Sequence, residues 1–273
     1  MTTNTAIQST DQHWQLKMFS RSLKKQLKLE AMLDLMPSVT NRVCLLVTCG
    51  DNNGALNWHF RAQGGRWLWA DIVAESLKEM SSLLNEPVYY VASTHLPFAG
   101  QQFDCVVAID VLEHLDDDQP FLRELYRILC PGGQAIVTVP NGDPQLLANR
   151  IKWLVGMTPA VYGHIRAGYM VTELSQSLQQ AGLNPVEQGG YSRFFTEMIE
   201  LIINFSYVFV LSRQKKGTPS RQIAPTTSGE LKTHGAAYKL YGALYPLMRL
   251  VSQLDKLLPA QTDNAVIVTA VKP

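Results

Sequence analysis

Two histidine-bearing segments carry the residue types best suited to proton-transfer chemistry. The stretch Asp110-Val111-Leu112-Glu113-His114 combines two acids with an imidazole, and His164 stands close to Arg166. Imidazole exchanges a proton near neutral pH, so either histidine can act as a general base. The guanidinium of Arg166 suits a carboxylate or a phosphate. The structural alternatives are a hydrogen-bonded core histidine at His114 and a surface loop around His164 and Arg166.

The elements around the first segment place it at the edge of a sheet. An apolar β-run, Phe103 to Ile109, ends directly before Asp110, and a helix from Pro120 to Leu129 follows. Pro131-Gly132-Gly133 then turns the chain into a second β-run, Gln134 to Val139. A strand, a helix and a strand joined by short turns form a parallel crossover unit. Ligands bind at the carboxyl ends of strands in such sheets, where Asp110 is expected.

Strands alternate with helices along most of the chain. Further strands are predicted at Val43–Val47, Arg66–Ala70, Val88–Val91, Val186–Tyr191 and Ala265–Val271. Helices are predicted at Val73–Leu84 and Thr172–Ala181, the second of them ended by Gly182. This alternation predicts an α/β fold with a doubly wound sheet.

Several short motifs occur in an order and spacing that together are specific. They are Leu96-Pro97-Phe98, Phe103-Asp104, Glu113-His114, Arg127-Ile128-Leu129 and Pro131-Gly132-Gly133. From Arg42 to Tyr191 the chain resembles a class I S-adenosylmethionine (SAM) methyltransferase of the small-molecule type. The resemblance implies SAM as the cofactor and a seven-stranded, mostly parallel, Rossmann-like sheet. It also implies that the last strand runs antiparallel to its neighbours.

The resemblance assigns a set of cofactor contacts to the carboxyl ends of the strands. They are Thr48, Gly50, Asp51, Asn52, Asp71, Ile72, His95, Leu96, Asp110 and Val111. Asp71 would accept hydrogen bonds from the ribose hydroxyls, and the alternative is an N-cap for the following helix. The loop after the first strand keeps only Gly50 and Gly54, and Leu46 stands where the family usually has an acid. His95 likewise replaces an acid that often contacts adenine.

Methyl transfer to a hydroxyl requires that the acceptor lose its proton. His114 and His164 are therefore the predicted catalytic bases, and Glu113, Tyr162 and Arg166 are the predicted substrate contacts. No metal site is expected, because none of the four cysteines forms a CxxC pair.

The bulk properties exclude some classes of protein. A net charge of +1 argues against a dedicated nucleic-acid binder, and a 46% hydrophobic composition supports a full core. Cys44 and Cys105 fall in predicted strands, which indicates buried, reduced thiols. The first residues are polar through Gln12, so we expect no secretory signal and a cytoplasmic location. No apolar run is long enough to predict a spanning helix.

The N-terminal residues 14–36 read as one helix that Pro37 ends. Leu16, Phe19, Leu23 and Leu27 mark one face of it, and Lys17, Arg21, Lys24 and Lys28 form a basic stripe on another. One interpretation is a helix packed on the domain with a solvated charged face. The other is contact with an anionic membrane surface or substrate.

The predicted organisation separates an extension, a domain and an insertion. Residues 1–37 form a helical extension, 38–192 the SAM-binding domain, 193–262 a helical insertion and 263–273 the last strand. The insertion holds an apolar stretch (198–211), a polar loop (215–230) and an amphipathic stretch (238–258). From Ser212 to Lys256 the chain has eight basic residues and two acids, a local charge of +6. These stretches either complete the core or a homodimer interface, or they bind an anionic membrane.

Together these observations predict a SAM-dependent methyltransferase. The expected reaction is O-methylation of a small acceptor that is apolar or lipid-linked, with no nucleic-acid partner. The expected location is the cytoplasm, with peripheral attachment to the inner face of the membrane as an option. The alternative is a degenerate SAM-fold protein without catalysis, acting as a membrane-docked or scaffolding partner.

Overall fold

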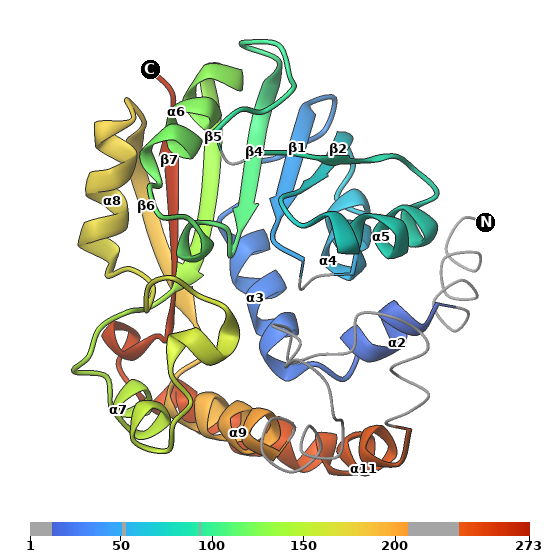
Figure 1. Ribbon diagram of the computed structural model, residues 1–273, viewed down its shortest axis with the longest axis vertical. Helices are drawn as coiled ribbons and strands as arrows, with labels where there is room; N and C mark the ends of the chain where they lie inside the picture. The colour runs from blue at the N-terminus through green and yellow to red at the C-terminus, as the bar shows by residue number, and fades with distance from the viewer. Residues whose placement is uncertain (1–12, 51–52, 93, 207–234) are drawn as a thin grey trace.

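The computed structural model describes residues 13–50, 53–92, 94–206 and 235–273. Its centre is a seven-stranded sheet in the order β3-β2-β1-β4-β5-β7-β6 (Figure 1). The strands are β1 (Val43–Thr48), β2 (Arg66–Asp71), β3 (Val88–Tyr90), β4 (Phe103–Ile109), β5 (Leu129–Pro140), β6 (Asn184–Tyr191) and β7 (Ala265–Val271). Neighbours from β3 to β5 pair in parallel, whereas β7 is antiparallel to both β5 and β6. The predicted doubly wound, mostly parallel fold is therefore confirmed.

Helices cover both faces of the sheet. The longer ones are α2 (Trp14–Phe19), α3 (Leu23–Asp34), α4 (Ala55–Arg61), α5 (Leu77–Leu84), α6 (Gln119–Ile128), α7 (Leu147–Leu154), α8 (Val171–Gln180), α9 (Phe194–Phe205) and α11 (Gly235–Ser252). Single 3-10 turns are η1 (Ala74–Ser76), η2 (Leu112–His114), η3 (Pro159–Tyr162), η6 (Gln253–Leu257) and η7 (Ala260–Thr262).

Alternate residues of the central strands enter two different cores, as the pleat of a strand requires. Leu45 and Val47 of β1 belong to the core that α6 and α8 cover. Cys44 and Leu46 belong to the core that α2, α3, α4 and α5 cover. Cys44 and Cys105 are register partners on β1 and β4, and both are buried and free, as predicted.

The N-terminal segment is two helices, so the prediction of a single helix over 14–36 was wrong. α2 ends at Phe19 and α3 begins at Leu23. The Ser20 hydroxyl donates to the Lys17 carbonyl, and Ser22 has extended backbone. Serine side chains bond to nearby backbone in this way and so compete with helix continuation.

The strand β5 begins earlier than the sequence suggests. It runs from Leu129, so Pro131-Gly132-Gly133 lies within the strand and was wrongly predicted as a turn before it. Gly132 has a φ of +75°, and the register against β4 shifts between Phe103 and Cys105. Glycine tolerates this positive φ, so the strand bends here and continues.

The described part of the insertion is helical, and η6 near its end bonds to the start of α9. In Figure 1, α7, α9 and α11 lie together beyond the carboxyl ends of β1 and β4. The carboxylate of Asp255, in η6, accepts hydrogen bonds from the backbone N–H groups of Arg193, Phe195 and Thr196 at the start of α9. An acid at a helix N-terminus satisfies its orphan donors and complements its dipole. The predicted loop at 215–230 lies outside the described residues.

Candidate active site

The end of β2 meets the loop after β1 through a buried carboxylate. Asp71 is fully buried, and its Oδ2 accepts the Thr48 hydroxyl at 2.6 Å. Its two oxygens also accept the Gly50 N–H at 3.0 Å and the Val73 N–H at 2.7 Å. Asp71 thus fixes the shape of the loop after β1. It also caps the turn that begins at Val73, which was the structural alternative to ribose binding.

The loop itself needs its glycines. Gly50 and Gly54 have φ of +67° and +90°, a region that side-chain-bearing residues rarely adopt. A Cβ on Gly54 would lie 3.1 Å from the Cα of Met80, so a larger residue would push α4 away from α5. Asp51 and Asn52, two predicted cofactor contacts, lie outside the described residues.

The predicted adenine contacts sit in different environments. The His95 side chain is 74% exposed, with Nδ1 3.5 Å from Glu124. Leu96 is buried, and its N–H donates to the same carboxylate at 2.7 Å. Ile72 is half-buried and Val111 is buried, both against the sheet core. Leu96, Ile72 and Val111 therefore offer apolar surface at this edge, while the contact assigned to His95 stays a prediction.

At the end of β4, Asp110 pairs with a lysine from the N-terminal extension. Asp110 has a φ of +50°, and Lys28 of α3 forms an ion pair with its Oδ2. The exposed fraction of Lys28 is 6%. The expectation of a solvated basic face was therefore wrong for Lys28. The chain places a cation and an anion together, out of bulk water, at the carboxyl edge of the sheet.

The two predicted bases meet, although they lie far apart in the sequence. The rings of His114 and His164 stand edge to face with centroids 4.9 Å apart. His114 Nδ1 lies 3.2 Å from the Gly163 carbonyl oxygen, and the Ile165 N–H donates to the Glu113 carbonyl at 2.9 Å. These two contacts hold the loop after η3 against η2, and the ring of Tyr162 lies 5.7 Å from that of His164.

Arg166 contacts Asp118 and Tyr169 within the protein. Its Nη1 lies 3.6 Å from Asp118 Oδ2, and its guanidinium stacks 4.7 Å over the ring of Tyr169. The Tyr169 hydroxyl donates to the same Asp118 oxygen at 2.6 Å. These contacts anchor the loop that carries His164, and a substrate contact by Arg166 stays a prediction.

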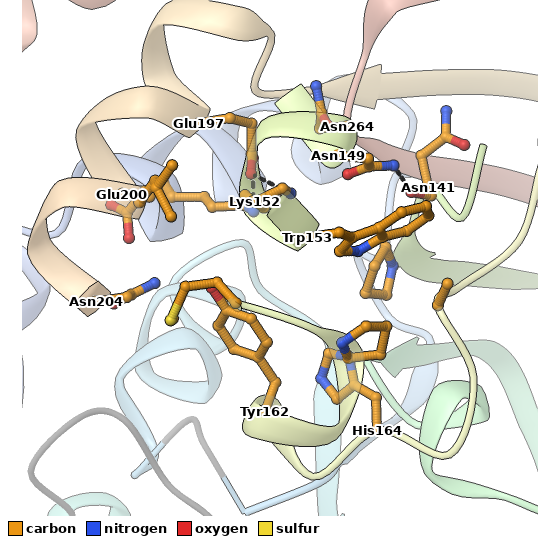
Figure 2. A pocket seen from close by; sticks show the side chains of 16 residues that line it. Asn141, Asn149, Lys152, Trp153, Tyr162, His164, Glu197, Glu200, Asn204 and Asn264 are labelled. Carbon is orange, nitrogen blue, oxygen red and sulfur yellow. Dashed lines mark hydrogen bonds and ion pairs between the residues drawn. The ribbon is translucent and has the colours of Figure 1, made fainter. Parts of the chain in front are cut away.

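A cavity of about 110 Å³ opens beside Tyr162 and His164 (Figure 2). Residues from α3, α7, α9 and the end of β5 line it, among them Lys24, Asn141, Asn149, Lys152, Trp153 and Glu197. Figure 2 shows Lys152 and Glu197 on one side of the cavity and Tyr162 and His164 on the other. Sequence reasoning missed this cavity, because its lining comes from segments far apart in the chain.

Charged groups dominate one wall of the cavity. Lys24 Nζ and Lys152 Nζ lie 2.6 Å and 3.0 Å from the two carboxylate oxygens of Glu197, which is 2% exposed. Burial favours the neutral acid, but the charges of Lys24 and Lys152 outweigh it and lower the pKa of Glu197 to about 2. Burial lowers the pKa of Lys152, and Glu197 offsets part of that effect. Glu197 is therefore ionised and holds both lysines at the wall.

The residues at the carboxyl edge fit SAM. The positive φ of Gly50 allows the loop backbone to approach a ligand closely, and Asp71 has the acid chemistry that a ribose diol needs. Lys28 and Asp110 match the carboxylate and the ammonium of the methionyl group.

Three groups with metal-ligating chemistry, Glu113, His114 and His164, have ligand atoms within 4.8 Å of one another.

Comparison with known proteins also indicates a methyltransferase. Residues 45–137 match the family model of a methyltransferase domain. A ubiquinone biosynthesis O-methyltransferase of Ruegeria pomeroyi is 35% identical over 101 residues, which cover 34% of this chain and 39% of the relative. A ubiquinone/menaquinone biosynthesis C-methyltransferase of Haemophilus ducreyi is 33% identical over 77 residues, 27% of this chain and 30% of the relative. The chain thus spans less than half the length of these curated relatives.

A solved structure shares the fold at low identity. The geranyl diphosphate C-methyltransferase of Streptomyces coelicolor, bound to magnesium, geranyl diphosphate and S-adenosylhomocysteine, superposes with a TM-score of 0.57 at 13% identity. The superposition covers 91% of this chain and 78% of that one. The domain match identifies residues 45–137 as a methyltransferase domain, and the strand order and the shared fold are those of class I SAM-dependent methyltransferases, whose cofactor is SAM.

Proposed function

We propose that the protein is an active SAM-dependent methyltransferase that methylates an oxygen of a small acceptor. One observation carries the proposal: the edge-to-face pair of His114 and His164, of which His164 lines the cavity and His114 follows the end of β4. A hydroxyl acceptor needs a base, and the pair places the imidazole of His164 at the cavity wall with that of His114 against it. The curated O-methyltransferase relative supports oxygen as the acceptor atom.

SAM supplies a methyl group already activated on a sulfonium, so the protein mainly has to align the acceptor and remove its proton. Lys28 and Asp110 would hold the methionyl end, and Asp71 the ribose. His164 lines the cavity, and His114 stands behind it with Nδ1 near the Gly163 carbonyl. That contact keeps the His114 ring in place while His164 accepts the proton of the acceptor hydroxyl.

Binding of S-adenosylhomocysteine tests the proposal without knowledge of the acceptor. A ligand that binds only the native state must raise its apparent stability, by about 2.7 kcal/mol when its concentration is a hundredfold above Kd. We expect the thermal midpoint to rise with added S-adenosylhomocysteine and not with homocysteine, measured by differential scanning fluorimetry. An unchanged midpoint would favour the alternative, a SAM-fold scaffold without catalysis.

We also propose that the acceptor is apolar or lipid-linked and that the protein reaches it at an anionic membrane. No described helix is long and apolar enough to cross a membrane. Exposed apolar side chains nevertheless gather on α7, α9, α11 and η6: Leu154, Ile202, Leu244, Leu247, Leu250, Leu254 and Leu257. Arg150, Arg249 and Lys256 are exposed on the same elements. Apolar surface beside basic charge suits an interfacial helix.

Flotation with liposomes checks the membrane proposal. The protein should float with anionic vesicles at low salt, and high salt should release it, because each basic residue contributes about 1 kcal/mol that salt screens. Leu250→Ser combined with Leu257→Ser should weaken flotation. Tyr90→Ser is the matched control, because Tyr90 is an exposed apolar residue on β3, away from these helices. Protein that stays unbound at low salt would assign the exposed leucines to a homodimer interface instead.

A further inference from the structure

The cavity beside His164 has more lysine N–H donors than the carboxylate of Glu197 accepts. Lys24 comes from α3 and Lys152 from α7, and the single carboxylate of Glu197 pairs with both. The Ser192 hydroxyl also donates to this carboxylate. An ammonium group has three N–H donors, so each lysine keeps donors beyond the one that Glu197 receives. Both lysines line the cavity, where a ligand can meet those donors.

The second acid of the wall does not cancel this charge by an ion pair. Glu200 also lines the cavity, and within the described residues it forms no ion pair shorter than 4.0 Å. Burial raises the pKa of Glu200, and the charge of Lys24 offsets part of that rise. Within the described residues, Glu197 is the carboxylate that forms ion pairs with both lysines. Lysine donors left without an acceptor in a buried wall are costly, and an anionic ligand would supply that acceptor.

A third group at the cavity, the side-chain amide of Asn264, has a hydrogen-bond acceptor that no described residue uses. Asn264 is 4% exposed and lines the cavity, and its Oδ1 has no hydrogen-bond partner among the described residues. Buried polar atoms are almost always paired, so an unpaired oxygen on a residue that lines the cavity is a candidate to accept a hydrogen bond from a ligand. Trp153 and Tyr162 add flat aromatic surface between this acceptor, the lysines and His164.

We propose that this cavity is the acceptor site and that it selects an acceptor carrying an anionic group, a carboxylate or a phosphate. Lys24 and Lys152 bind the anionic group of the substrate, and Asn264 accepts a hydrogen bond from the substrate. The body of the substrate lies along Trp153 and Tyr162, and its hydroxyl lies at His164. This assignment rests on the proposed methyltransferase function and adds a substrate class to it. An apolar chain attached through a phosphate would satisfy both this site and the membrane proposal.

Direct binding to the S-adenosylhomocysteine complex tests the assignment by calorimetry. The probes are para-hydroxybenzoate and inorganic phosphate, with methyl para-hydroxybenzoate as the neutral analogue. We expect at least one anion to bind about tenfold more tightly than the neutral ester, which corresponds to one charge-assisted contact. The arm that binds distinguishes a carboxylate from a phosphate.

Three variants separate an anion site from a merely structural ion network. Lys152→Met and Lys24→Met should each remove the preference for the anion, while Glu197 keeps the other lysine and Ser192 as partners. Glu197→Gln should strengthen anion binding severalfold, because it frees both ammonium groups from a competing carboxylate. Lys78→Met is the matched control, since Lys78 is exposed on α5 and its loss changes net charge equally.

The outcomes are distinguishable from failure of the methyltransferase proposal. Anion preference that the two lysine variants lose and the control keeps supports the assignment. Equal binding of anion and ester, no anion binding at millimolar concentration, or a preference that Lys152→Met retains would overturn it. In those cases S-adenosylhomocysteine binding still stands as an independent measure of the proposed function.

Discussion

Alanine in place of His114 or His164 should lower turnover about a hundredfold or more while S-adenosylhomocysteine affinity stays the same. The rings lie 4.9 Å apart on segments that the Ile165–Glu113 backbone hydrogen bond joins, so either loss removes the proton acceptor or its support. Steady-state kinetics and calorimetry measure the two quantities. His59→Gln is a suitable control, because His59 packs on Phe19 in the other core. Added imidazole should restore part of the turnover in the His164 variant.

Chelation decides between proton transfer and metal binding at the same residues. Ligand atoms of Glu113, His114 and His164 lie within 4.8 Å of one another, which is close enough for one ion. Bases work without a metal, so dialysis against a chelator should leave turnover unchanged. Turnover that a chelator abolishes and a divalent cation restores would contradict the base assignment and the sequence-based expectation of no metal site. Full turnover in both alanine variants would leave alignment as the mechanism.

The sheet could be predicted because its signals are local. The β-runs before Asp71 and Asp110 are largely buried on both faces, so the sequence shows them as continuous apolar stretches. Each stretch is followed by an aspartate, which marks the end of the strand in the sequence. The break between α2 and α3 was harder to predict. The apolar face continues across it through Phe19 and Leu23, and only the two serines indicate that the helix stops.

The charged residues of α3 show where sequence reasoning ends. Lys24 and Lys28 lie one turn apart on the helix, which is all that periodicity can establish. Their burial depends on where α3 packs over the sheet edge. Their partners, Glu197 and Asp110, come from the insertion and from the end of β4. Glu197 stands in an apolar stretch, and that unusual setting was the available signal for a buried ion pair.

The loop after β5 shows the same limit of sequence reasoning at two residues that lie close together in the chain. His164 meets His114 across the site, whereas Arg166 turns to Asp118 and Tyr169. Residue type predicted substrate contact for both, because a histidine and an arginine on a loop at the carboxyl edge suit an acceptor equally well. The position of Asp118 at the start of α6 gives Arg166 a partner within the protein, which residue type alone did not predict. We therefore expect Arg166→Lys to act first by weakening the contacts with Asp118 and Tyr169 that anchor the loop.

Alanine in place of Asp71 should weaken S-adenosylhomocysteine binding about tenfold to a hundredfold, the loss expected for a hydrogen bond to a charged group of about 1.5–3 kcal/mol. The sequence alone suggests that this variant keeps an intact fold. The structure predicts an additional loss of stability, because Asp71 is buried and accepts bonds from Thr48, Gly50 and Val73. Calorimetry and thermal melts measure the two effects.

A double cycle separates ribose binding from loop support. The second ligand is an analogue of S-adenosylhomocysteine without the two ribose hydroxyls. If Asp71 binds the ribose, Asp71→Ala should cost affinity for S-adenosylhomocysteine and leave the analogue nearly unaffected. Thr48→Val is the matched control, because it removes one loop bond to Asp71 and keeps the carboxylate. Equal losses for both ligands would assign Asp71 to the loop alone, and the ribose would then need another partner at the end of β2.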